Sequence, residues 1–171
     1  MTSAQPLDPS EDEATVLWKQ PTKAADYTDS EAPVVVIPRG GTREVGRSCY
    51  QLQTQYGEYL IDCGLKQGAG SGDAVSFPDF RGIGSYDLDA VFLTHAHIDH
   101  IGGLPLLEHK NKLSRDAPIV CTRPTGALAH QLLHDSLKIH KENAEKPGRE
   151  QRFTEEDVRD VLDRFEPVPY G

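Results

Sequence analysis

The 171-residue sequence lacks the features that mark secreted and membrane proteins. Its amino terminus has no basic region followed by an apolar run, and no stretch approaches the roughly 18 apolar residues that a membrane span needs. Cysteine is scarce: Cys49, Cys63 and Cys121 are odd in number, far apart and form no CxxC pair. This usage fits reduced thiols that pack as small apolar residues. We therefore expect a soluble, cytoplasmic protein.

Positive charge is also in short supply, because the formal net charge is -9 and the pI is about 5.2. An acidic protein repels polyanions unless positive charge is gathered locally, which argues against simple nucleic-acid binding. Residues 1–32 hold seven acids and two bases, and they mix Ser, Thr and Pro without apolar periodicity. This pattern predicts an acidic flexible leader over 1–32 and one domain over 33–171.

The remaining chain alternates between patterns typical of strands and of helices. Strands are expected at 34–37, 48–54, 58–62, 88–93 and 118–121. Helices are expected from Asp99, from Pro124 to about Asn143, and from Thr154 to about Phe165. Residues 64–84 are rich in Gly, Ser and Asp and predict a long loop of the kind that often borders a functional site. This order predicts an α/β fold with helices covering the sheet.

The long helix predicted after Pro124 separates apolar from polar side chains on a helical wheel. Its apolar face is expected to consist of Leu128, Ala129, Leu132, Leu133 and Ile139. His130 and His134 lie opposite, at a spacing that could bind a metal, but the glutamate of an HExxH site is absent between them. We therefore expect these two histidines on a solvated face.

A cluster of histidines and an aspartate follows the strand predicted at 88–93, in the run Thr94 to His100. Residues two apart point to the same side of an extended chain, so His95 and His97 can offer imidazoles to one metal. As the chain turns into the next helix, Asp99 and His100 can hold a second metal, and both ligand types suit zinc. This HxHxDH pattern would arise by chance in roughly one in a thousand such chains.

Two metal ions in this arrangement could bridge one water molecule, lower its pKa and stabilise charge on an ester or phosphodiester under attack. Asp62, at the end of the strand predicted at 58–62, could accept an N–H from a metal-bound histidine and fix its tautomer. An ordinary turn aspartate is an equally good interpretation of Asp62. The sequence thus predicts a two-metal hydrolase site, with Asp62 as its candidate support.

Asp62 together with HxHxDH resembles the first two motifs of the metallo-β-lactamase superfamily, whose fold is a four-layer αββα sandwich. Three flanking segments look similar to the β-CASP RNA nucleases, especially archaeal ones and those like the polyadenylation-factor endonuclease. These segments are Gly40–Cys49, Thr94–Pro105 and Cys121–Thr125. The resemblance covers about residues 34–171 and implies that the amino-terminal half or so of such a sandwich is present.

By this resemblance, His95 and His97 would bind the first zinc, and Asp99 and His100 the second. Asp99 would also orient the attacking hydroxide, and Asp62 would support the cluster. The implied reaction is hydrolysis of an RNA phosphodiester by endonucleolytic or exonucleolytic cutting. Positive charge to meet phosphates could come from Arg39, Arg43 and Arg47, although scattered surface arginines are the more common explanation of such a pattern.

The sequence also departs from the family pattern. The family completes its metal site with a histidine of a third motif and an aspartate of a fourth, and neither motif is found after His100. The β-CASP insertion is missing too, and His109, His130, His134 and His140 fall on predicted helices away from the cluster. Four ligands without a bridging group should hold metal weakly. We therefore expect a partial domain that is inactive alone.

Two alternatives to an RNA-processing nuclease stay open. The first is a metallo-hydrolase of the same superfamily that acts on a small thioester or lactone. The second is no enzyme but a metal-poor module that binds RNA, forms a homo-oligomer or pairs with a full-length relative through an exposed sheet surface.

Overall fold

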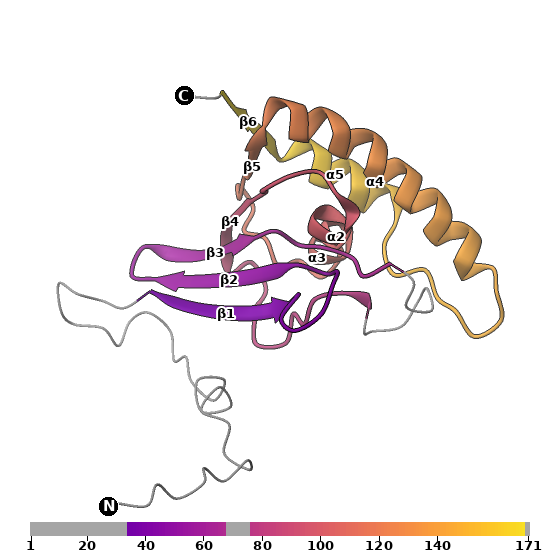
Figure 1. Cartoon of the computed structure of the whole chain (residues 1–171), viewed down its shortest axis with the longest axis horizontal. Helices are drawn as coiled ribbons and strands as arrows, with labels where there is room; N and C mark the ends of the chain where they lie inside the picture. Colours follow the sequence, from indigo (N-terminus) through magenta and orange to yellow (C-terminus); the bar gives the residue numbers. More distant parts are fainter. Residues whose placement is uncertain (1–33, 68–75, 170–171) are drawn as a thin grey trace, which may run out of the picture.

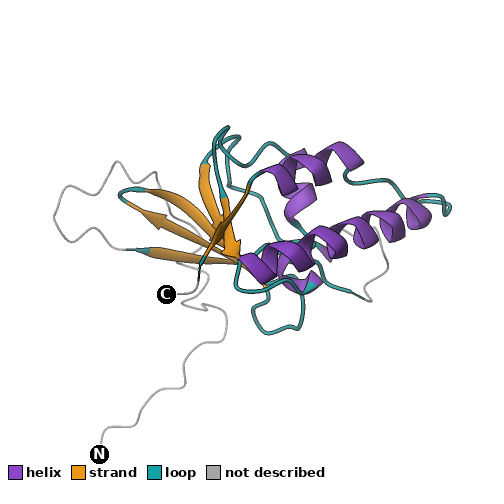
Figure 2. Cartoon of the chain, turned by 90° about the horizontal axis from the view of Figure 1, so that it is seen from above, coloured by secondary structure: helices purple, strands orange, loops and turns teal. Residues whose placement is uncertain are grey.

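A computed structural model describes residues 34–67 and 76–169 of the chain. The predicted leader at 1–32 and the middle of the predicted Gly-rich loop lie outside these residues. The described residues form one mixed sheet with helices packed on one of its faces (Figures 1 and 2). The predicted α/β class is confirmed.

The sheet has six strands whose spatial order follows the sequence, β1-β2-β3-β4-β5-β6. The strands are β1 (Val35–Gly40), β2 (Cys49–Thr54), β3 (Gly57–Ile61), β4 (Leu88–Phe92), β5 (Ile119–Thr122) and β6 (Phe165–Val168). The first three pair antiparallel, and β3 to β6 pair parallel. The carboxyl ends of β3, β4, β5 and β6 therefore meet at one edge of the sheet.

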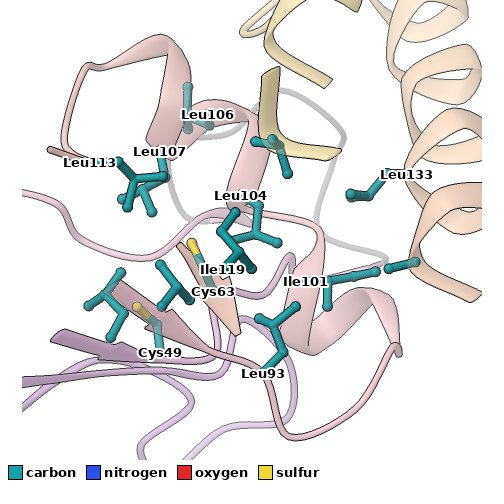
Figure 3. Close-up of a cluster of buried hydrophobic side chains, with 14 of the residues drawn as sticks. Cys49, Cys63, Leu93, Ile101, Leu104, Leu106, Leu107, Leu113, Ile119 and Leu133 are labelled. Carbon is teal, nitrogen blue, oxygen red and sulfur yellow. The ribbon is translucent and has the colours of Figure 1, made fainter. Parts of the chain in front are cut away.

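Four helices are present in the described residues, and they complete the core. They are α2 (Ile98–Ile101), α3 (Leu104–His109), α4 (Arg123–Ala144) and α5 (Glu155–Asp163), with the numbering of Figure 1 starting at α2 in the described part. Apolar side chains of the helices meet those of the sheet in one cluster, in which Ile101, Leu104 and Ile119 are fully buried (Figure 3). All three cysteines are buried free thiols, as expected.

Three boundaries differ from the sequence prediction. β1 continues through Pro38, which pairs with Tyr50, because β1 is the outer strand of the sheet and proline is tolerated on an edge. The helix predicted from Asp99 is split into α2 and α3 at Gly102 and Gly103. The last helix ends at Asp163, and residues 165–168 form β6, whose four residues gave too short a pattern to be predicted.

The buried face of α4 also differs from the prediction. Its buried residues are Thr125, Gly126, Ala129, Leu133 and Leu137, which follow the i, i+4 spacing of one helical stripe. Leu128 and Ile139 were expected on this face, but their side chains are 59% and 58% exposed. The prediction that His130 and His134 face solvent is confirmed, since both are exposed and their rings stack at 5.4 Å.

The face of the sheet without helices is partly apolar. A row of paired residues crosses four strands on this face: Tyr50 lies opposite Ile61, Ile61 opposite Phe92, and Phe92 opposite Val120. Phe92 is 43% exposed. Within the described residues, no helix is both long enough and apolar enough to cross a bilayer.

The loop between β1 and β2 is tied to the segment after β3 by an ion-pair network around Glu44. Its carboxylate accepts hydrogen bonds from Arg47 at 2.5 Å and from Lys66 at 2.7 Å. Both hydrogen bonds lower the pKa of Glu44, to about 2, and the bond from Lys66 has the larger effect. The loop is thereby fixed beside the carboxyl edge of the sheet.

The first prediction tests which face of α4 is buried. Leu133→Ala should lower the free energy of unfolding by about 2–5 kcal/mol, because it removes a fully buried side chain from the core. Leu128→Ala, on the same helix, should change it by less than about 0.5 kcal/mol. Urea unfolding of both variants measures the difference. Equal losses would show that the assigned face is wrong.

The second prediction concerns pH. Because the pKa of Glu44 is lower in the folded chain than its ordinary value of 4.5, the ionised carboxylate stabilises the fold above pH 4.5. This stabilisation is lost as the pH falls from 4.5 toward 2. Glu44→Gln should therefore melt at a lower temperature than the wild type at pH 7, and the deficit should narrow by pH 3.

Glu145→Gln removes an equal charge from an exposed position at the end of α4 and serves as the control. If the melting temperature of Glu44→Gln lies below that of the wild type by the same amount at pH 7 and at pH 3, the assigned network is contradicted.

Candidate metal centre

The candidate site lies at the carboxyl edge of the sheet, where two neighbouring parallel strands end. Asp62 follows β3, and Thr94 lies two residues after β4. Ile61 and Phe92 are paired in the sheet, and the Asp62 backbone N–H donates to the Phe92 carbonyl at 2.9 Å. Parallel pairing thus brings together two segments that are 32 residues apart in the chain.

The carboxylate of Asp62 is the most buried polar group of the site, with an exposed fraction of 2% for the residue. Its backbone has a φ of 58°, in the left-handed region, so the chain turns sharply as it leaves β3. The carboxylate accepts hydrogen bonds from the Thr94 N–H at 2.9 Å and from the Thr94 hydroxyl at 2.8 Å. It also contacts Nδ1 of His100 at 2.7 Å. A buried carboxylate is stable here because each oxygen is hydrogen-bonded.

These contacts fix the tautomers of two imidazoles. An ionised carboxylate only accepts hydrogen bonds, so Nδ1 of His100 carries the proton and Nε2 has a free lone pair. The single hydroxyl proton of Thr94 is donated to Asp62, so Thr94 can only accept from Nδ1 of His95, 2.9 Å away. Nε2 of His95 is then also unprotonated. One buried carboxylate therefore leaves a ring nitrogen of each of the two histidines unprotonated and able to bind a metal.

His95 and His97 present two nitrogens to the same point. Nε2 of His95 lies 3.2 Å from Nδ1 of His97. Two nitrogens that bind one tetrahedral zinc at about 2.0–2.1 Å are separated by about 3.3 Å. The spacing predicted from the alternation of an extended chain is thus present, and the pair fits two corners of a zinc site.

Asp99 and His100 form a second pair on the adjoining turn. Oδ2 of Asp99 lies 3.7 Å from Nε2 of His100, the nitrogen that Asp62 leaves unprotonated. The rings of His95 and His100 are in contact, with centroids 3.9 Å apart, so the two pairs adjoin. The structure therefore brings all five predicted residues together.

Each pair supplies only two ligands. Within residues 34–67 and 76–169, no three His, Cys, Asp or Glu side chains are placed so that they could enclose a metal ion. Structural zinc sites use four protein ligands and catalytic ones commonly three. The donor chemistry fits zinc, but each position lacks at least one further ligand among the described residues.

Backbone hydrogen bonds hold the cluster against two segments, one just before β2 and one just after β3. Ser48 N–H donates to the Asp99 carbonyl at 2.8 Å, and Cys63 N–H donates to the His100 carbonyl at 2.7 Å. Gly64 lies so close that a Cβ there would be 1.7 Å from the Asp99 carbonyl oxygen. Gly102 and Gly103 are tightly packed too, since added Cβ atoms would come within 2.7 Å of their neighbours.

Two functional contributions were not predicted from the sequence. Thr94 links Asp62 to His95, and its only sequence signal is its place just before the cluster. Ser48 acts through its backbone N–H, and because almost every residue type has this group, the sequence gives no hint of its role. Of the three arginines considered for phosphate binding, Arg39 and Arg47 line a common pocket, whereas Arg43 is exposed and does not line it.

The remaining histidines lie away from the cluster, as expected. Nδ1 of His109 contacts Asp157 at 3.1 Å, and the His140 ring stacks on Phe153 with centroids 4.3 Å apart. Nε2 of His140 also accepts from the Arg152 backbone N–H at 2.8 Å. Burial lowers the pKa of His140, with the Arg152 charge as a smaller cause.

Three curated proteins are similar in sequence to most of this chain. Transcription termination factor FttA of Methanocaldococcus jannaschii is 40% identical over 134 residues, which are 77% of this chain and 20% of that protein. Probable RNase MJ4 of the same organism is 34% identical over 80% of this chain and 29% of that protein. The Integrator complex subunit 11 homolog of Dictyostelium discoideum is 36% identical over 79% of this chain and 18% of that protein.

The chain thus spans between about a fifth and a third of the length of these curated relatives. Among solved structures, AidC, a dizinc quorum-quenching lactonase, is 20% identical with a TM-score of 0.40, over 71% of this chain and 42% of that one. The metallo-β-lactamase SMB-1 is 18% identical with a TM-score of 0.39, over 80% of this chain and 44% of that one.

A family model described as the metallo-beta-lactamase superfamily matches residues 42–166, which include every residue of the candidate metal centre. Proteins of this fold bind divalent metal ions. The three curated relatives belong to the β-CASP family, as the resemblance of the flanking segments predicted. This chain belongs to the metallo-β-lactamase superfamily and is similar in sequence to its β-CASP members.

Proposed function

We propose that this chain supplies the first half of a two-zinc centre that hydrolyses RNA phosphodiesters. The observation that carries the proposal is the pair of nitrogens on His95 and His97, 3.2 Å apart, with the adjoining pair of Asp99 and His100. RNA is supported as the substrate by the relatives, one of which is named a probable RNase and another a transcription termination factor.

In this proposal, His95 and His97 hold the first zinc, and Asp99 and His100 hold the second. When bound, zinc supplies a Lewis acid that neutralises charge on the phosphodiester and lowers the pKa of water. Asp99 has a side chain that is 38% exposed, so its carboxylate can accept a hydrogen bond from the attacking water and orient it.

Asp62 and Thr94 act as positioning residues. They touch no substrate, but they keep Nε2 of His95 and of His100 unprotonated and hold both rings in place. Loss of such outer contacts commonly weakens metal binding by about 10- to 100-fold.

We further propose that the chain alone holds zinc weakly and does not cut RNA efficiently. Each zinc position has two donors in the described part of the chain, and a site of this kind has fewer bonds with which to offset the hydration of the ion. The three buried free thiols support a place in the reducing cytoplasm.

The third prediction tests the metal centre. Zinc binding is measured by competition with a chromophoric chelator, for the wild type and for the double variant His95→Ala/His97→Ala. The variant should lose at least about tenfold in affinity, because it removes both ligands of one position. His130→Ala/His134→Ala removes two exposed histidines from α4 and should leave zinc affinity unchanged. Equal affinities for all three proteins would refute the assigned ligands.

The same zinc-loaded proteins are given a labelled single-stranded RNA and, separately, a thioester and a lactone. We expect RNA cleavage no faster than in the chelator-treated control. Chelator-sensitive cutting that matches that of a competent nuclease would overturn the incomplete site. Hydrolysis of the thioester or lactone, lost in His95→Ala/His97→Ala, would favour the small-molecule alternative.

A further inference from the structure

A pocket of about 730 Å³ lies apart from the candidate metal centre and is lined by six cationic side chains. They are Arg39, Arg47, Arg81, Lys110, Lys112 and Arg152. The only acid in its lining is Asp79. The whole chain has a net charge of -9, so this pocket concentrates positive charge against the balance of the protein.

Two of these cations are paired with carboxylates. Arg81 donates to both carboxylate oxygens of Asp79, at 2.9 Å to Oδ1 and 2.7 Å to Oδ2, and these hydrogen bonds lower the pKa of Asp79. Arg47 binds Glu44, and its second guanidinium nitrogen donates to the Phe77 carbonyl at 2.9 Å. The single lining acid is therefore already neutralised by its neighbour.

Two other cations donate to neutral oxygens. Arg39 donates to the Gln51 side chain and to the Arg81 carbonyl. The ammonium group of Lys112 donates to the Ile83 carbonyl. These contacts hold the side chains in place without cancelling their charge, so the preorganised groups keep a positive field for an anion.

The walls of the pocket are apolar. Phe77, Pro78, Phe80 and Leu106 lie between the charged groups and are themselves buried. A pocket of several hundred cubic ångströms with apolar walls and a few fixed polar groups has the size of a small-ligand site. An extended binding track would instead place its cations along an open surface.

We propose that this pocket binds a phosphate-bearing ligand of nucleotide size. Arg39 and Arg47 are fixed at one side by hydrogen bonds, and Lys110 and Lys112 approach from the end of α3. None of the pocket's lining residues is one of the candidate metal ligands, so the inference stands independently of the proposed hydrolysis. It connects to the metal centre through Arg47, whose neighbour Ser48 donates to the Asp99 carbonyl.

The fourth prediction tests this site with pyrophosphate as the probe. Calorimetric titration of the full chain in low salt and EDTA should show saturable binding, with metal-mediated binding excluded by the chelator. Lys110→Gln/Lys112→Gln should weaken it by roughly tenfold or more, because two charge-assisted contacts are lost. Lys138→Gln/Lys141→Gln lowers the net charge equally on exposed positions of α4 and should bind as the wild type does.

No saturable binding by the wild type, or equal weakening in both double variants, would overturn the proposal. Circular dichroism melts check that the variants are folded, and Lys110→Gln alone, with a smaller loss, keeps the test valid if Lys112→Gln unfolds the chain.

A competition arm identifies the source of the phosphate. Adenosine monophosphate should displace pyrophosphate. A single-stranded RNA octamer without terminal phosphates, compared at equal phosphate concentration, should displace it no better than adenosine monophosphate does. Stronger displacement by the octamer would overturn the nucleotide-sized ligand and make the pocket part of an RNA path.

Discussion

The candidate metal centre depends on one buried carboxylate. The carboxylate of Asp62 accepts hydrogen bonds from the N–H and hydroxyl of Thr94 and from Nδ1 of His100. It thereby joins the end of β3 to the HxHxDH turn. Without it, the imidazoles of His95 and His100 would have no constraint on which nitrogen is protonated. A histidine binds metal only through an unprotonated nitrogen, so this hydrogen bonding precedes any chemistry at the site.

The sheet explains how this carboxylate reaches its partners. β3 and β4 are parallel neighbours, so their carboxyl ends lie side by side although a long connection separates them in the chain. The left-handed turn at Asp62 and the close approach of Gly64 to the Asp99 carbonyl then press the segment after β3 against α2. The same packing buries Asp62, and its burial makes each of its hydrogen bonds obligatory.

Local patterns in the sequence were enough to predict most of this arrangement. Alternating or apolar runs predicted five of the six strands, and the HxHxDH spacing predicted that His95 lies beside His97 and Asp99 beside His100, because both depend on residues close together in the chain. Asp62 was ambiguous from the sequence, since its partners lie more than 30 residues away and only the parallel register of β3 and β4 brings them together.

Other features depend on tertiary packing and could not be predicted in this way. Residues 165–168 form the strand β6 because they can pair with β5 at the end of the sheet. Leu128 is exposed on α4 although leucine is a residue type typical of a core. The basic pocket combines residues from β1, the following loop, the segment around Asp79 and the end of α3. Arg39 and Arg47 look like scattered charges until the fold places them beside Lys110 and Lys112.

The most direct test of the central claim is the tautomeric state of the histidines in the metal-free chain. Long-range ¹H–¹⁵N NMR correlations at pH 8 distinguish a protonated Nδ1 from a protonated Nε2 for each ring. If Asp62 organises the site, His95 and His100 carry their proton on Nδ1, and Asp62→Ala abolishes this preference in both while His130 is unchanged. A proton on Nε2 of His100 in the wild type would contradict the account.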